Sequence, residues 1–193
     1  QAQAGCTIVR MTRIAIVSAM DEELSALLPL VDGARVDVHA GRRFHVGRVG
    51  SHDVVLVLSG IGKVAAACTA TVLIERHGVE RLVFTGVAGG LHECAQVGDV
   101  VIADQLLQHD LDVSPLFPRH EVPLLGFSRF TADAALSAQL HTAVQTALAT
   151  SRQWLGSDAA ALGVTAPRLH RGLVISGDRF VATAAESQAL RTE

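Results

Sequence analysis

Short apolar stretches alternate along the chain with longer segments in which apolar residues recur every three or four positions. The first stretch, residues 13–17, is apolar and β-branched, which predicts a short buried strand. Leucines then recur at near-helical spacing from Leu24 to Leu30, so a helix is predicted from about Met20. Because strands and helices continue to alternate in this way, the pattern predicts an α/β protein with a mostly parallel sheet.

The rest of the chain follows the same alternation. A helix is predicted at residues 62–77, with one apolar face that includes Val64 and Cys68, and it ends at Gly78. Residues 115–128 hold three prolines and no apolar period, which indicates a loop or lid. Thr183 and Glu186 have capping-box spacing, which predicts a last helix. The other predicted elements are strands at residues 35–38, 43–49, 53–58, 82–84, 99–106 and 173–175, and a helix at residues 136–148.

Three consecutive acids, Asp21, Glu22 and Glu23, follow the first strand directly. They occupy the first turn of the predicted helix, at the carboxyl end of a strand, where α/β folds commonly bind ligands. Acids in a first turn also complement the helix dipole, and one or two acids are enough for that purpose. The third acid therefore makes this strand end a candidate functional site.

Composition limits the classes of function. The chain has 49% hydrophobic and 18% charged residues, no tyrosine and 4% aromatic residues, which suits parallel strands covered on both faces. A net charge of −3 without a basic tract argues against nucleic acid as the main partner. No apolar run approaches the roughly 20 residues of a membrane-spanning helix, so no membrane partner is expected.

Candidate metal ligands are sparse at the level of sequence. Cys6, Cys68 and Cys94 are scattered without metal-ligand spacing and indicate free thiols in a reducing, cytoplasmic compartment. The segment His109–Asp112 also fits no metal motif, and we expect a polar loop that its backbone hydrogen bonds satisfy. Neither a metal nor a cofactor is predicted.

Glycine-rich turns follow several predicted strands. Residues 60–65 match G-x-G-x-x-A between a strand and a helix, which taken alone is a dinucleotide fingerprint, although it follows the fourth strand rather than the first. Residues 85–90 form a second turn of this kind. Together with the turns near Met20 and Gly177, they predict a small-molecule pocket at the strand ends.

Six ordered segments resemble the 5′-methylthioadenosine/S-adenosylhomocysteine nucleosidases of the nucleoside phosphorylase superfamily. The resemblance runs from Arg13 to the end of the chain and implies a three-layer α/β/α fold with a central mixed, mostly parallel twisted sheet. The matching segments are IAIVSAMDEE, SGIGKVAAA, TGVAGG, VGDVVIAD, HDLDV and GLVISGDRF.

The resemblance also implies an activity and a site. Members of this family hydrolyse the N-glycosidic bond of adenine nucleosides that carry a 5′-thioether, and release adenine. Glu23 matches the carboxylate that polarises the attacking water, which is a suitable task for a proton acceptor close to the sugar. The positions that match substrate-binding residues are Met20, Ile61, Val87, Ala88, Gly89, Phe180 and Val181. Residues 113–125 match a lid that reaches a neighbouring subunit, so a homodimer is expected.

Several departures and alternatives stay open. Val87 stands where the family often has serine, and the family's ribose-binding Glu and general acid lie beyond Glu193. We therefore expect residues 1–10 to be an extension and residues 11–193 to be one nucleosidase-like domain that lacks its C-terminal part. The alternatives are a purine nucleoside phosphorylase, a futalosine-type nucleosidase, a non-catalytic nucleoside-binding relative and a nicotinamide-dependent oxidoreductase. Phe180 could also be an ordinary core residue, as could Met20.

Overall fold

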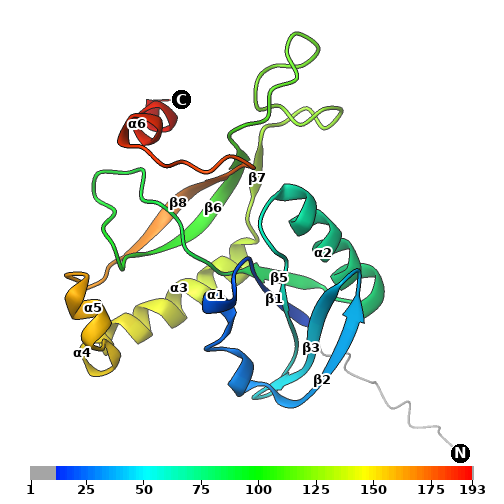
Figure 1. Ribbon diagram of the computed structural model, residues 1–193, viewed down its shortest axis with the longest axis vertical. Helices are drawn as coiled ribbons and strands as arrows, with labels where there is room; N and C mark the ends of the chain where they lie inside the picture. Colours follow the sequence, from blue (N-terminus) through cyan, green and yellow to red (C-terminus); the bar gives the residue numbers. More distant parts are fainter. Residues whose placement is uncertain (1–11, 193) are drawn as a thin grey trace, which may run out of the picture. The chain divides into compact units, whose positions relative to one another are not determined.

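The structure is a computed structural model that describes residues 12–192 (Figure 1). The described chain forms two compact units, which divide after Ala88. The extension expected at residues 1–10 and its cysteine, Cys6, lie outside the described residues. That the two units are parts of one domain stays a prediction.

The first unit is built on a five-stranded sheet with the strand order β2-β3-β4-β1-β5. Four consecutive residues of β4, Val54–Val57, are buried, which means that the middle of this sheet is covered on both faces. The unit's elements are β1 (Ile14–Ser18), α1 (Asp21–Leu24), η1 (Leu28–Leu30), β2 (Asp32–His39), β3 (Arg42–Val49), β4 (His52–Leu58), α2 (Lys63–His77) and β5 (Arg81–Phe84).

The sheet is mixed, as expected. Strands β4, β1 and β5 are parallel neighbours, whereas β2–β3 and β3–β4 are antiparallel hairpins. Ala40 and Gly41 connect the first hairpin with φ values of 47° and 73°, the left-handed pair that tight hairpin turns require. Two-residue turns allow only antiparallel pairing, so parallel pairs make up half of this sheet rather than most of it.

The helix predicted at residues 62–77 is present as α2, but its buried face is not the predicted apolar face. Gly78 adopts the left-handed conformation, and its N–H reaches the carbonyls of the last turn, which ends the helix as expected. The buried residues of α2 are Thr69, Leu73 and His77, whereas Val64 and Cys68 of the predicted face are exposed. The helix is rich in alanine and carries apolar residues on more than one side, so the sequence pattern did not define the packed face.

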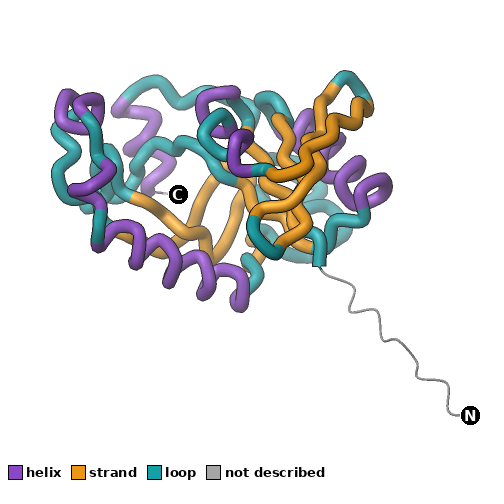
Figure 2. Tube along the Cα trace, turned by 90° about the horizontal axis from the view of Figure 1, so that it is seen from below, coloured by secondary structure: helices purple, strands orange, loops and turns teal. Residues whose placement is uncertain are grey.

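The second unit is built on a three-stranded sheet with the order β7-β6-β8. Strands β6 and β8 are parallel, and the long helix α3 packs along them (Figure 2). Asp133 caps α3 by accepting a hydrogen bond from the N–H of Leu136 at 2.7 Å. The unit's elements are β6 (Val100–Gln108), β7 (Arg129–Thr131), α3 (Ala134–Ala149), α4 (Ser151–Trp154), α5 (Ser157–Ala161), β8 (Leu169–Ser176) and α6 (Ala184–Thr192).

Three local predictions differ from the structure. Helix α1 ends at Leu24 instead of continuing, and Pro29 lies in the separate 3₁₀ turn that follows. The three-residue strand β7 was not predicted, because all of its residues are exposed and no alternation is visible over so short a stretch. Residues 150–170, for which no helix or strand was predicted, contain the short helices α4 and α5. Elements of three to five residues carry too little pattern to be recognised from sequence.

Residues 12–192 include two of the three cysteines of the chain. Cys68 and Cys94 are free thiols, both exposed. No helix in this part of the chain combines the length and the apolar character that crossing a membrane requires.

The packed face of α2 can be tested at two adjacent residues. Leu73 is fully buried, so Leu73→Ala should lower the free energy of unfolding by about 2–5 kcal/mol. Ile74 is 55% exposed, and the control Ile74→Ala should change it by no more than about 0.5 kcal/mol. Chemical denaturation of both variants measures the difference. Equal losses would mean that α2 does not pack on this face.

Candidate active site

The candidate site lies at one edge of the first unit's sheet, where three neighbouring parallel strands end. Ser18 of β1 pairs with Leu58 of β4, and Val17 pairs with Phe84 of β5. The backbone continues this pairing past the strand ends, since the N–H of Thr85 donates to the Val17 carbonyl at 2.9 Å. Three segments therefore leave the sheet at the same edge, and they carry Met20 to Glu23, Ile61 and Val87.

The carboxylate of Glu23 is held at this edge by backbone N–H groups. One oxygen, Oε2, accepts hydrogen bonds from Ala19 at 2.9 Å and from Met20 at 3.0 Å. The other oxygen, Oε1, accepts from the N–H of Val87 at 2.8 Å. A carboxylate offers about four acceptor positions, so one position on Oε1 is left over by these three bonds. Of the predicted residues, the structure brings together Glu23, Met20 and Val87.

Gly86 makes the contact between Glu23 and the β5 turn possible. A Cβ atom at this position would lie 2.8 Å from Oε1 of Glu23 and 3.0 Å from Cδ. Real Cβ atoms do not approach other atoms so closely, so any side chain here would displace the carboxylate. The sequence predicted a glycine-rich turn here, but it did not identify the glycine that Glu23 approaches.

The hydrogen bonds determine the ionisation of Glu23. Burial alone would raise the pKa of this half-buried carboxyl, but the N–H groups of Val87, Met20 and Ala19 outweigh it and hold the pKa below the ordinary value of 4.5. Glu23 is therefore a carboxylate at neutral pH and can accept a proton or orient a water molecule.

Helix capping explains only part of this arrangement. Glu23 is the third residue of α1, and its bond to the N–H of Met20 is the one that an acid makes in a capping box. The bond to Val87 joins residues 64 positions apart and serves no cap. Asp21 and Glu22, in contrast, are exposed first-turn acids, as the helix-dipole explanation expects.

Apolar side chains surround this strand end without being buried. Met20 is 39% exposed, Ile61 is 80% exposed and Val87 is 82% exposed. The alternative that Met20 belongs to the core is therefore wrong for the described chain. Ala88 is also exposed. Sites for small molecules combine apolar side chains with a few precisely placed polar groups, and this strand end offers both kinds of group.

In the second unit, the turn after β8 carries two of the predicted residues, Phe180 and Val181. Gly177 lies so close to the segment His109–Asp112 that a Cβ would be 2.5 Å from Nε2 of His109. The carboxylate of Asp110 accepts a hydrogen bond from the N–H of Asp178 at 2.8 Å and thereby anchors the turn. His109–Asp112 is thus a hydrogen-bonded polar loop, as expected, and its role in positioning this turn was not predicted.

Phe180 projects from the anchored turn with 88% of its surface exposed, which contradicts the alternative that it is core. Val181 follows it and is half-buried. The carboxylate of Glu186 accepts hydrogen bonds from the N–H and the hydroxyl of Thr183, and the N–H of Glu186 donates to that hydroxyl, which completes the predicted capping box. Glu186 also forms an ion pair with Arg179. Gly89, the first residue of this unit, is exposed, and nothing lies within 4 Å of the place where its Cβ would be.

Asp99, in the second unit, has a pKa well below its ordinary value. Burial would raise this pKa, but hydrogen bonds from His170 and from the backbone of Arg168 and Gln96 overcome the effect. His170 lies 2.7 Å away, at the start of β8, while Asp99 directly precedes β6. The cluster joins the beginnings of two paired strands, which is a structural task.

Comparisons with known proteins agree with the resemblance. A family model described as the phosphorylase superfamily matches residues 13–193. The 5′-methylthioadenosine/S-adenosylhomocysteine nucleosidase of Bacillus thuringiensis strain Al Hakam is 40% identical over 134 residues, which make up 69% of this chain. The match covers 58% of that protein, so the chain spans less than two thirds of the curated relatives it matches.

Solved structures show the same fold. The Streptococcus pneumoniae MTA/SAH nucleosidase, crystallised with 8-aminoadenine, superimposes with a TM-score of 0.77 at 34% identity, over 94% of this chain and 71% of that one. The Colwellia psychrerythraea enzyme in complex with adenine gives 0.79 at 29% identity, over 95% and 69%. The predicted α/β class with a mixed sheet is confirmed.

The close contact between Gly86 and the carboxylate of Glu23 predicts an effect of the substitution Gly86→Ala. The added methyl group should push the carboxylate away from Val87, so the Val87 amide should lose its partner and exchange with solvent faster. Hydrogen exchange followed by NMR measures this rate. Gly172→Ala is the control, because nothing lies within 4 Å of the Cβ it adds. Unchanged protection of Val87 in Gly86→Ala would contradict the proposed contact.

Proposed function

The chain belongs to the phosphorylase superfamily, and from this membership we propose that it hydrolyses the N-glycosidic bond of 5′-thio-substituted adenine nucleosides. Methylthioadenosine and S-adenosylhomocysteine are the proposed substrates, and adenine is the product. The observation that carries the proposal is the ionised carboxylate of Glu23, held by backbone N–H groups at the carboxyl edge of parallel strands. Similarity to proteins named as nucleosidases for these two compounds supports the choice of substrate.

Glu23 is the proposed catalytic residue. Cleavage of a nucleoside passes through an oxocarbenium-like sugar, so water needs orientation and a proton acceptor rather than strong activation. Three of the acceptor positions on the carboxylate are taken by backbone donors, which leaves Oε1 to accept a hydrogen bond from the water. A low pKa keeps this acceptor deprotonated in the resting protein.

The other predicted residues receive binding roles. We propose that Met20 lies against the ribose, that Ile61 lines the same pocket, and that the turn at residues 87–89 flanks the nucleoside. Phe180 would stack on the adenine ring, and the backbone of Val181 would contact the edge of the base. The exposure of Phe180 supports this role, because an aromatic face that stacks on a ligand must be accessible.

Water is favoured over phosphate as the nucleophile by charge. A phosphorolytic site needs cations that bind a dianion. Here the segment after β1 presents Asp21, Glu22 and Glu23, which repel phosphate. A futalosine-type nucleosidase would share this feature and is distinguished by its substrate. The interpretation as a nicotinamide-dependent oxidoreductase is supported only by the glycine-rich turn at residues 60–65.

We also propose a cytoplasmic homodimer. Residues 113–125 form an extended, turn-rich segment that carries Leu116 at 80% and Leu124 at 89% exposure. Apolar side chains at such exposure suit a lid that packs on a second copy of the chain. The two free thiols, Cys68 and Cys94, suit a reducing compartment.

Incubation of the protein with methylthioadenosine, with and without phosphate, tests the proposed reaction. Adenine should appear at the same rate in both. Dependence on phosphate would indicate a phosphorylase, and no product together with binding of adenine nucleosides would indicate a non-catalytic relative.

Glu23→Gln should abolish turnover and leave binding of an adenine-containing inhibitor largely intact. Glutamine keeps the shape of the side chain but cannot accept a proton, so the loss should fall in kcat. Steady-state kinetics and calorimetric inhibitor binding separate the two quantities. The matched controls are Asp21→Asn and Glu22→Gln, which should retain activity. Full activity of Glu23→Gln would remove this residue from its proposed role.

Phe180→Ala should weaken nucleoside affinity by about 1–3 kcal/mol, the usual effect of removing an aromatic ring that stacks on a base. The melting temperature should hardly change, because the side chain is 88% exposed. Both quantities can be measured on one preparation. A lower melting temperature with unchanged affinity would show that Phe180 packs in the protein and does not contact the base.

A further inference from the structure

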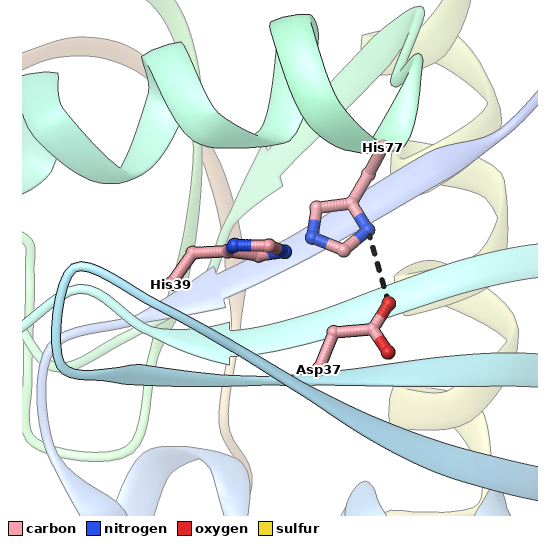
Figure 3. Close-up of side chains that lie close together, drawn as sticks. All are labelled: Asp37, His39 and His77. Atoms are coloured by element: carbon pink, nitrogen blue, oxygen red, sulfur yellow. Dashed lines mark ion pairs between the residues drawn. The ribbon is translucent and has the colours of Figure 1, made fainter.

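Three potential metal ligands meet in the first unit, away from the residues that hold Glu23. Asp37 and His39 come from strand β2, and His77 comes from the last turn of helix α2 (Figure 3). One carboxylate oxygen and one nitrogen of each imidazole all lie within 4.8 Å of one another. Among the described residues, no other group of three such ligands lies this close together. The sequence did not indicate the cluster, because His77 is distant from β2 along the chain.

The register of the sheet explains why the three side chains share one side. Asp37 pairs with Phe44 of β3, and residues two apart on a strand, such as Asp37 and His39, face the same way. His77 packs over that face, with its ring stacked on the ring of Phe44 at 4.8 Å between centroids. The imidazole of His39 meets that of His77 edge to face at 5.6 Å.

The imidazole of His77 is buried without a normal hydrogen bond. Its side chain is 3% exposed, and Nε2 has no partner among the described residues. Its Nδ1 lies 3.9 Å from Oδ2 of Asp37, too far for a hydrogen bond. Two ligand atoms on a tetrahedral zinc ion, with bonds of about 2.0–2.2 Å, are roughly 3.3–3.6 Å apart. The observed gap is close to that separation.

Asp37 supplies the carboxylate of the cluster, and a guanidinium group lies beside it. Arg35 lies 3.4 Å from Oδ2 of Asp37, but its side chain is 68% exposed and can turn away. Asp37 and His39 are half-buried and have the freedom to close the remaining distance.

We propose that Asp37, His39 and His77 bind a divalent transition-metal ion, of which Zn²⁺ is the best match to two imidazoles and one carboxylate. Three protein ligands leave a fourth position for water. The ion joins strand β2 to the end of helix α2 and gives the buried imidazole a partner. This site is separate from the proposed reaction and does not depend on it.

Calorimetry and thermal melting with Zn²⁺, together with absorption spectra with Co²⁺, test the site. The protein should bind one equivalent of metal, its melting temperature should rise with Zn²⁺, and the Co²⁺ complex should show tetrahedral d–d bands without thiolate charge transfer. The last feature excludes Cys68 and Cys94 as the ligands.

His39→Ala and Asp37→Asn should each weaken Zn²⁺ binding by more than about tenfold, since losing even an outer hydrogen-bond partner of a ligand costs about 10–100-fold. Both side chains are half-buried, so these variants should fold. His45→Ala is the matched control, because His45 pairs with Val36 on the opposite face of the sheet and should leave binding unchanged. Equal affinity in His39→Ala and His45→Ala, or no binding by the unaltered protein, would overturn the proposal.

Discussion

Three backbone N–H groups that grip one carboxylate are the interaction on which the site depends. Two of these N–H groups belong to Ala19 and Met20, in the turn between β1 and α1. The third belongs to Val87, which follows β5, a neighbour of β1 in the sheet. The grip joins two adjacent strand ends and keeps the carboxyl ionised despite its partial burial. These three hydrogen bonds thus position the candidate catalytic group and favour its ionised form.

This grip requires particular local features. The chain must turn sharply after β1 so that the third residue of α1 faces back toward the sheet, and the turn after β5 must lack a side chain at Gly86. The parallel pairing of β1 with both β4 and β5 brings these turns to one edge. In the second unit, Gly177 and Asp110 perform a similar task for the turn that carries Phe180.

The sequence predicted these features unevenly. Strands with continuous apolar runs, such as β1 and β4, and glycine-bounded α2 were recognised, because burial and capping leave a visible pattern. The candidate role of Glu23 followed from its place and from the family resemblance. The pattern did not show the packed face of α2, the contact of Gly86 with Glu23, or the cluster around His77. Each of these depends on how segments distant in sequence meet, which periodicity does not encode.

A pH titration of Glu23, followed by ¹³C NMR at its carboxyl carbon, tests these three hydrogen bonds most directly. The signal is assigned by its absence in Glu23→Gln. Hydrogen bonds from three N–H groups favour the charged form, so the midpoint should lie below 4.5. A midpoint at or above that value would mean that burial prevails over the backbone donors. Glu23 would then not be the firmly held carboxylate from which the proposed hydrolysis proceeds.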